Sequence, residues 1–178
     1  VGIHPHDSKE LDENALSQLR EMSRHPKVKG IGEIGLDFYY DRSERDVQRK
    51  GFRRQIRLAN ELKLPIVIHS RDADAETMEI LREEGAFSSE RQSFFPYRRD
   101  ENGEKVPDSR VLIHCYSGSK EMAREYVKLG ATISICGPVT FKNNRKTSEV
   151  AEDIPIEFLT VETDSPYLAP VPKRGKKN

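Results

Sequence analysis

Short apolar segments alternate with longer amphipathic segments along the chain. Period-3.6 spacing of apolar positions predicts helices, and the intervening apolar runs predict strands. The predicted helices cover residues 43–63, 75–84 and 120–129, with Ser43 as an N-cap and Gly85 and Gly130 as C-terminal caps. The predicted strands cover residues 28–36, 66–68, 111–113, 132–136 and 157–161. Strands separated by helices indicate a parallel α/β sheet, which is either a closed barrel or an open doubly wound sheet.

A polar segment at residues 88–109 interrupts this alternation. A loop of this length is uncommon inside a compact domain, so we expect an insertion that is either functional or mobile. Its aromatic and basic residues suit stacking on bases and contact with phosphates. We favour the simpler interpretation that the aromatic side chains attach the insertion to the body of the domain. These residues are Phe94, Phe95, Tyr97, Arg98 and Arg99.

Metal-ligating residue types occur in or just after four of the predicted strands. They are Glu33, His69, His114 and Asp164. Taken singly, each has an ordinary explanation, such as a hydrogen-bonded structural histidine or an Asx-turn at Asp164. Four at equivalent places favour a TIM-type (β/α) barrel, where every strand ends at one rim, over an open sheet that collects ligands at one switch point. Imidazole with carboxylate suits Zn²⁺ or Mn²⁺ better than Mg²⁺, so the pattern predicts a metal-dependent hydrolase.

The charge balance limits the kinds of partner. The chain has 30 Lys+Arg and 30 Asp+Glu residues, giving a formal net charge of zero. A neutral protein is not expected to coat nucleic acid with a broad basic face, although it can bind one phosphate locally. No apolar run approaches the roughly 20 residues that a membrane span needs, so we expect no membrane segment.

The two cysteines, Cys115 and Cys136, lie in apolar runs without CxxC spacing. This arrangement favours buried, reduced thiols over a disulfide, and reduced thiols are typical of cytoplasmic proteins. We therefore expect a cytoplasmic location.

Several sequence blocks, in order along the chain, resemble the TatD family of metal-dependent deoxyribonucleases. Any one block is a weak signal, but five linked blocks in the family's order are specific. The blocks are residues 2–6 (GIHPH), 32–39 (GEIGLDFY), 65–73 (PIVIHSRDA), 114–119 (HCYSGS) and 162–168 (ETDSPYL), followed by 174–178 (RGKKN).

The resemblance implies a distorted TIM barrel of the amidohydrolase-like class that uses divalent ions to cleave DNA. The complete enzyme would bind two ions, which could be Zn, Mn or Mg. Glu33 would bridge the two ions, and His69 and His114 would bind one of them. Asp164 would be both a ligand and the proton acceptor. His4 and Arg71 match positions near the substrate phosphate.

The match departs from the family at its beginning. The family's first strand carries an H-x-H pair that binds the second metal, and no such strand is present here. His4–Pro5–His6 copies the spacing, but its Gly2–Ile3 prefix resembles the third strand, so His6 has no assigned role. We therefore expect residues 1–178 to form about strands 3–8 of eight, shortened at both ends, compared with about 250 residues in a typical barrel. Such a chain would close poorly and lack one metal's ligands.

Other functions remain compatible with the sequence. The same metal chemistry would serve an amidohydrolase or esterase that acts on a small molecule or on aminoacyl-tRNA. Loss of the H-x-H strand is also compatible with a remnant that binds nucleic acid without cutting it. A role in a larger complex has no support beyond the polar insertion, and the sequence indicates no protein partner.

Overall fold

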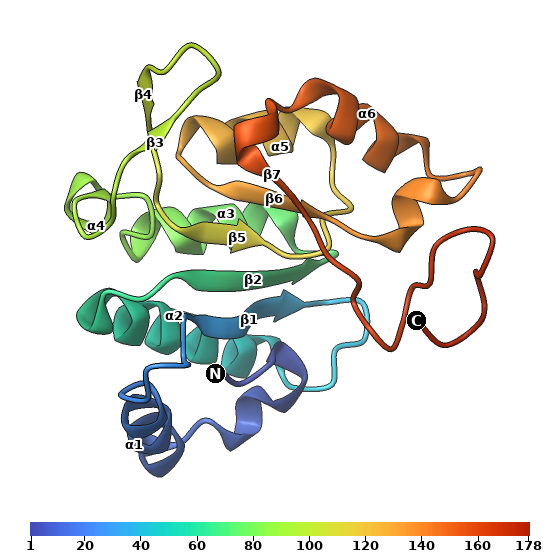
Figure 1. Cartoon of the computed structure of the whole chain (residues 1–178). Coiled ribbons are helices and arrows are strands. Elements are labelled where there is room, and N and C mark those ends of the chain that lie inside the picture. The colour runs from blue at the N-terminus through green and yellow to red at the C-terminus, as the bar shows by residue number, and fades with distance from the viewer.

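A computed structural model describes all 178 residues of the chain. Five parallel strands form one sheet in the order β1-β2-β5-β6-β7 (Figure 1). Because the strands run in the same direction, their carboxyl ends share one edge of the sheet, called the rim below. The strand bounds are β1 (Ile31–Asp37), β2 (Ile66–Arg71), β5 (Val111–Ile113), β6 (Thr132–Ile135) and β7 (Leu159–Val161).

Helices connect the strands and pack against the sheet (Figure 1). Helix α2 packs on β1, α3 packs on β2, and α5 packs on β6 and α6. None of the helices is long and apolar enough to cross a membrane. The α-helices are α1 (Glu13–Met22), α2 (Arg45–Leu62), α3 (Asp74–Glu83), α4 (Ser89–Gln92), α5 (Lys120–Lys128) and α6 (Arg145–Asp153), and the 3-10 helices are η1 (Pro5–Glu10), η2 (Gly137–Thr140) and η3 (Ile156–Phe158).

The hydrophobic core lies between the sheet and the helices. Phe52, Ile56 and Ala59 recur at helical spacing on α2 and are buried in the same cluster as Ile34 and Ile68 from the strands. Burying each large side chain contributes about 1.5–3 kcal/mol. The helical periodicity of α2 therefore fixes which face of the helix meets the sheet.

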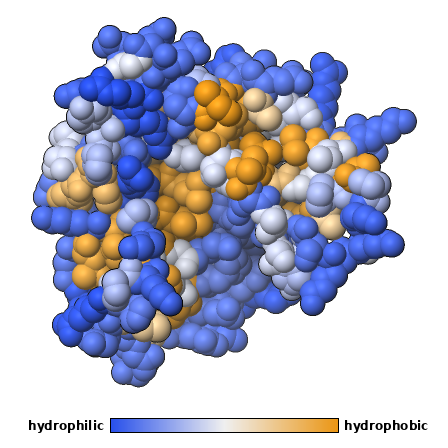
Figure 2. Space-filling model, viewed as in Figure 1, coloured by the Kyte–Doolittle hydropathy of each residue, from blue (hydrophilic) through white to orange (hydrophobic).

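The sheet is open. Strands β1 and β7 lie at its two edges and do not pair with each other. Val67 and Leu112, which alternate with buried residues of β2 and β5, are only half-buried, and Val161 on β7 is exposed. Figure 2 shows apolar residues at the surface across the middle of the molecule. The prediction that residues 1–178 alone do not close into a barrel is therefore confirmed.

The first residues lie alongside β1, where the sixth expected strand would be. The Gly32 N–H donates to the Val1 carbonyl over 2.8 Å. The Gln55 side chain on α2 accepts from the Ile3 N–H (2.7 Å) and donates to the Ile3 carbonyl (3.0 Å). The first bond places the segment along β1, the bonds to Gln55 attach it to α2, and together they bring His4 to the rim.

The predicted helices and strands are confirmed to within a few residues, with some differences. Helices α1 and α6 were not predicted. Residues 157–161 are divided between η3 and β7. The prediction that Ser43 caps α2 is wrong: Glu44 precedes the helix, and the Ser43 hydroxyl instead donates to the His6 carbonyl over 2.7 Å. Ser43 therefore holds η1, which follows His4, against the loop after β1.

The insertion at residues 88–109 is folded. It contains α4 and an antiparallel pair of short strands, β3 (Arg98–Arg99) and β4 (Lys105–Val106). Arg91 is 1% exposed and donates to Asn60 Oδ1 (2.6 Å) and to the carbonyls of Leu64 and Ser109 (2.9 Å each). Phe95 is half-buried against the Arg91 guanidinium, whereas Tyr97 is exposed. The insertion lies at the opposite end of the sheet from the rim (Figure 1).

The expectation of reduced thiols is wrong in this structure, in which Cys115 and Cys136 form a disulfide. The residues are 21 apart in sequence, but Cys115 follows β5 closely and Cys136 directly follows β6, and these strands are neighbours. Their Cα atoms are therefore 5.4 Å apart, a normal distance for a disulfide. The sequence lacked this information because strand order was not known. The cytoplasmic location stays a prediction.

Candidate metal centre

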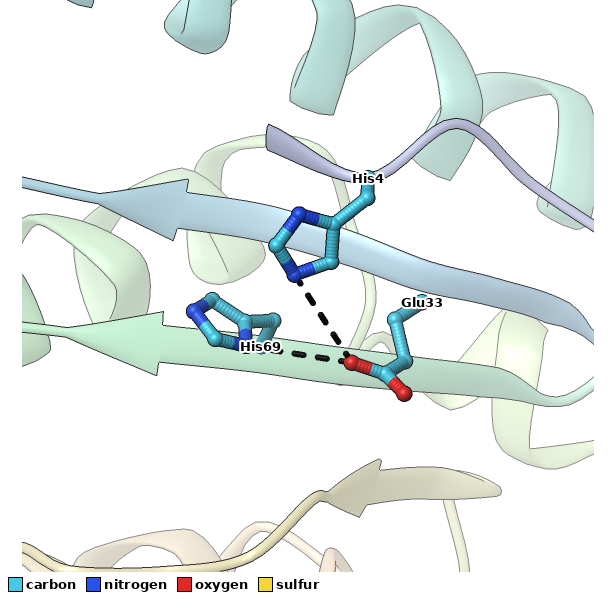
Figure 3. Close-up of side chains that lie close together, drawn as sticks. All are labelled: His4, Glu33 and His69. Atoms are coloured by element: carbon cyan, nitrogen blue, oxygen red, sulfur yellow. Dashed lines mark ion pairs between the residues drawn. The ribbon is translucent and has the colours of Figure 1, made fainter. Parts of the chain in front are cut away.

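Polar side chains from successive elements meet at the rim. Glu33 comes from β1, His69 from β2, and His4 from the segment beside β1 (Figure 3). His114 directly follows β5, and Asp164 lies in the turn after β7. The four residues predicted as metal ligands are thus brought together, and His4 joins them.

The carboxylate of Glu33 is at the centre of this group. Its Oε2 atom is 3.8 Å from His4 Nε2, 3.8 Å from His69 Nδ1 and 3.6 Å from His114 Nε2. These distances are too long for hydrogen bonds. They suit atoms arranged around a common ion, because ligands about 2.0–2.2 Å from a metal are spaced more widely than a hydrogen bond. One ligand atom from each of His4, Glu33 and His69 lies within 4.8 Å of the others.

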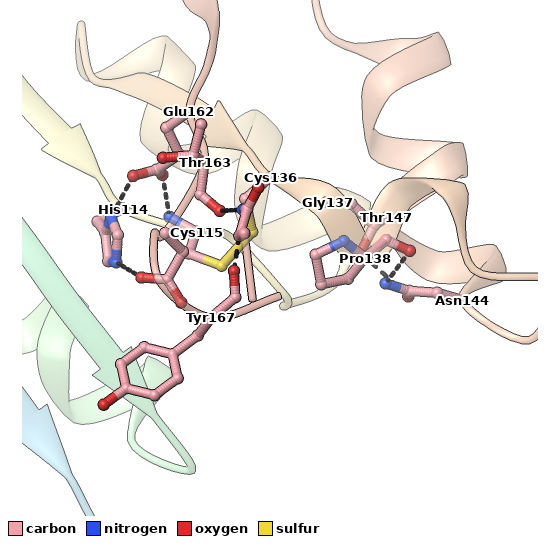
Figure 4. Close-up of a disulfide and its surroundings, with 12 residues drawn as sticks. His114, Cys115, Cys136, Gly137, Pro138, Asn144, Thr147, Glu162, Thr163 and Tyr167 are labelled. Carbon is pink, nitrogen blue, oxygen red and sulfur yellow. Dashed lines mark hydrogen bonds and ion pairs between the residues drawn. A yellow bond between two sulfur atoms is a disulfide. The ribbon is translucent and has the colours of Figure 1, made fainter. Parts of the chain in front are cut away.

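A second set of contacts surrounds His114 (Figure 4). His114 Nε2 is 3.2 Å from Asp164 Oδ1, and His114 Nδ1 is 2.5 Å from Glu162 Oε2. The other oxygen of Glu162 accepts from the Cys115 N–H over 2.6 Å. Glu162 therefore fixes the orientation of the His114 ring and leaves Nε2 facing Glu33 and Asp164, as outer carboxylates do for metal-binding histidines.

Asp37, at the end of β1, plays the same part for His69. Its side chain is fully buried, and Oδ2 is 2.7 Å from His6 Nε2 and 3.1 Å from His69 Nε2. Its Oδ1 accepts from the N–H groups of Tyr39 and Tyr40. Burial alone would raise the pKa of Asp37, but these hydrogen bonds and the histidines lower it below its usual value. A charged Asp37 thus turns His69 Nδ1 toward Glu33.

Close packing of β1 on β2 makes this geometry possible. Gly35 has a φ of 147°, and a Cβ atom there would lie 1.9 Å from the His69 carbonyl oxygen. Only glycine allows β1 to approach the backbone of His69 so closely. Glu33 and His69 can therefore face each other across adjacent strands.

The electrostatics of the group favour neutral imidazole and charged carboxylate at its centre. Burial and the neighbouring His69 and His6 rings lower the pKa of His4 to about 4. At pH 7 the His4 ring is therefore neutral, which is the form that binds metals. The contact with His69, together with the nearby His114 and His4, outweighs burial and lowers the pKa of Glu33.

The pKa values of His114 and Asp164 are shifted upward, in the opposite direction. Burial opposes a charge on His114, but the bond to Glu162 and the charges of Glu33, Glu162 and Asp164 raise its pKa. Burial and repulsion from Glu33 and Glu162 raise the pKa of Asp164, despite the attraction of His114. A bound cation would reduce the repulsion between these carboxylates and favour the charged form of Asp164.

These donors fit a divalent metal ion. Imidazole nitrogens and carboxylate oxygens converge, two of the imidazoles are oriented by outer carboxylates, and Glu33 pairs with no Lys or Arg. His4 was predicted near the substrate, and the structure places it among the candidate ligands. Arg71 lies at the same rim, at the end of β2.

Asp37, Glu162 and His6 were not predicted as site residues. Asp37 ends β1 and Glu162 directly follows β7, so both stand at a strand end as His114 does, whereas Glu33 and His69 lie inside their strands. The positions of Asp37 and Glu162 after apolar runs could therefore have identified both from the sequence. The sequence gives no such signal for His6, because only the fold places η1 beside Asp37.

A sequence model of the family described as "TatD related DNase" matches residues 1–178. The chain belongs to the TatD family. It is 44% identical over 178 residues to "Uncharacterized metal-dependent hydrolase YabD" of Bacillus subtilis and 33% identical over 171 residues to "3'-5' ssDNA/RNA exonuclease TatD" of Citrobacter koseri. These matches cover 100% and 96% of this chain, respectively.

The solved structure of YJJV, a TatD homologue from Escherichia coli, is similar over 100% of this chain, with a TM-score of 0.80 and 27% identity. The fold is therefore the TIM-barrel fold of TatD-like proteins, represented here by an open five-stranded sheet. The chain spans 61% of that structure, 62% of YabD and 58% of the Citrobacter protein.

Proposed function

We propose that this TatD-family protein is a divalent-metal-dependent hydrolase that cleaves phosphodiester bonds in DNA. The observation that carries the proposal is the convergence of His4, His69 and His114 on one carboxylate, Glu33, at the rim that also bears Arg71. The family match and the metal-dependent hydrolases among the relatives support the metal chemistry. The relative named an exonuclease supports the phosphodiester substrate.

Glu33, His4, His69, His114 and Asp164 are the residues that would hold the metal. Glu33 is common to both sets of contacts, so it is the candidate bridging ligand if two ions bind. A bound divalent ion polarises a phosphoryl oxygen and lowers the pKa of coordinated water. That chemistry requires neutral imidazoles and a charged carboxylate, the states that the pKa shifts of His4 and Glu33 favour.

Asp164 is the candidate proton acceptor. Its carboxylate is partly exposed at the rim, and its raised pKa makes it a better base than an ordinary aspartate. His114, oriented by Glu162, lies beside it and stabilises its charged form. Asp164 would take the proton of the attacking water, while Arg71 balances negative charge that gathers on the phosphate.

The proposal is tested by hydrolysis assays on the purified protein. Single-stranded DNA, an ester and an amide are offered with Mn²⁺ or Mg²⁺, and again after chelation. We expect cleavage of DNA that chelation stops and added metal restores. Cleavage that continues at the same rate after chelation contradicts the metal mechanism. Metal-dependent cleavage of the ester or amide but not of DNA assigns another substrate, and DNA binding without cleavage contradicts hydrolysis.

A further inference from the structure

Two exposed tyrosines stand at the rim beside the candidate metal centre. Tyr39 is 57% exposed and Tyr40 is 49% exposed, and their rings meet edge to face with centroids 4.9 Å apart. Neither belongs to the hydrophobic core. Adjacent exposed aromatic residues at the edge of a site are typical of ligand contact rather than of folding.

The tyrosines are connected to the centre through aromatic contacts. The Tyr40 ring is 5.5 Å from the His6 ring, and the His6 ring is 4.3 Å from the ring of His4, measured between centroids. His4 is one of the candidate metal ligands. A group stacked on the tyrosines would therefore lie close to a phosphate held at the centre.

Arginines lie over the same rings. The Arg71 guanidinium carbon is 4.3 Å from the Tyr39 centroid and 4.9 Å from the Tyr40 centroid, and the Arg42 carbon is 5.4 Å from the Tyr40 centroid. A guanidinium that contacts a ring with its face keeps N–H donors for phosphate. The nearby Asp41 is paired with Arg45 (2.9 Å).

The buried Asp37 side chain holds the turn that carries the tyrosines. Asp37 Oδ1 accepts from the N–H groups of Tyr39 (3.1 Å) and Tyr40 (2.8 Å), while Oδ2 bonds to His69. One buried carboxylate therefore fixes both the metal-ligand histidine and the tyrosine turn. A preorganised surface of this kind binds a ligand with less loss of conformational entropy.

We propose that Tyr39 and Tyr40, flanked by Arg71 and Arg42, stack a nucleobase next to the phosphate that is cleaved. Aromatic rings alternating with cationic groups match the alternation of base and phosphate in a nucleic-acid strand. Bases inside a duplex are already stacked on each other, so the surface would select single-stranded segments. This inference rests on the proposed function and adds the part of the substrate that is recognised.

Tyr97 provides a matched control within the same chain. It is also exposed (53%) and also contacts cations, with Arg99 at 5.0 Å and Lys105 at 4.2 Å from its centroid. It lies on the insertion, at the opposite end of the sheet from the rim (Figure 1). A general effect of losing an exposed tyrosine would appear there too.

The first test compares kcat/KM for two substrates, a single-stranded oligonucleotide and the same strand with abasic sugars on either side of the cleaved phosphate. We expect the protein to prefer the base-containing strand by about 5- to 150-fold, the effect of one stacked base. Tyr39→Leu should lose most of this preference, whereas Tyr39→Phe and Tyr97→Leu should keep it. An unaltered preference in both Tyr39→Leu and Tyr40→Leu would overturn the inference.

The second test measures binding without cleavage. A single-stranded oligonucleotide carrying 2-aminopurine is mixed with the protein in chelator, and stacking should quench its fluorescence less in Tyr39→Leu than in Tyr97→Leu. Tyr39-dependent quenching in a protein that cleaves no DNA with metal would support the stacking surface and contradict the nuclease. If the protein cleaves DNA but neither the quenching nor the substrate preference depends on Tyr39 or Tyr40, the result supports the nuclease and contradicts the stacking surface. Absence of quenching contradicts the stacking surface.

Discussion

The rim and the insertion at residues 88–109 are both rich in charged and aromatic residues, yet the structure uses them differently. In the insertion, the buried Arg91 is matched by three oxygen acceptors, two from the body of the domain (Asn60 and Leu64) and one from Ser109 at the end of the insertion. At the rim, Glu33 faces only histidines, at distances too long for hydrogen bonds. Charges that have protein partners hold the fold together. Charges that converge without such partners are available to a ligand.

Asp164→Asn should have the largest effect on the protein, and it should lower kcat without lowering stability. The change keeps the size of the side chain and removes the proton acceptor, so kcat should fall by about 10²- to 10⁴-fold. Because the fold raises the pKa of Asp164, the native state disfavours its charge and loses little when the charge is removed. The free energy of unfolding should therefore stay within about 0.5 kcal/mol of its original value.

Rate assays and urea unfolding on the same samples check this expectation. Glu79→Gln, on the exposed side of α3, is the control and should change neither quantity. Undiminished turnover in Asp164→Asn would remove Asp164 from its role. Equal losses of turnover and stability would mean that the rim, like the insertion, serves the fold.

Arg91→Met should have the opposite profile. The change leaves the buried Ser109 carbonyl and the half-buried oxygens of Asn60 and Leu64 without their donor, at a total cost of about 2–4 kcal/mol in the free energy of unfolding. Turnover per folded molecule should be unchanged. The control is Arg99→Met on the exposed hairpin, which should cost less than about 0.5 kcal/mol. An identical urea midpoint for Arg91→Met and the original protein would contradict this assignment.

Glu162→Gln should have the smallest effect of the three and tests the outer layer of the rim. The variant keeps an oxygen for the Cys115 N–H but no longer holds the His114 ring with a full negative charge. Metal affinity should fall by about 10- to 100-fold. Titration of Mn²⁺ into chelator-treated protein measures this change, with Glu79→Gln as the control. Unchanged affinity would indicate that His114 needs no such support.

Much of the framework could be predicted from the sequence because its signals are local. Helical periodicity located α2, α3 and α5, and apolar runs located the strands of the sheet. The rule that parallel strands end at one rim was sufficient to bring Glu33, His69, His114 and Asp164 together before any coordinates. The comparisons confirm the family resemblance. The roles near the substrate phosphate that the resemblance implied for His4 and Arg71 stay predictions.

The features that were missed depend on three-dimensional neighbours. The Cys115–Cys136 disulfide follows from the order of β5 and β6 in the sheet, which sequence spacing does not reveal. The Ser43 hydroxyl bonds to a segment 37 residues away instead of capping its own helix. Asp37 likewise works through residues on η1 and β2 that only the fold brings to it.

The central claim is that the rim residues share a divalent cation. Anomalous diffraction at the manganese edge, from crystals grown with Mn²⁺, tests it most directly. We expect a peak about 2.0–2.3 Å from the Glu33 carboxylate and within bonding distance of at least two of His4, His69 and His114. A Mn²⁺ peak bound only elsewhere on the protein, or no ordered peak at saturating Mn²⁺, would contradict the account.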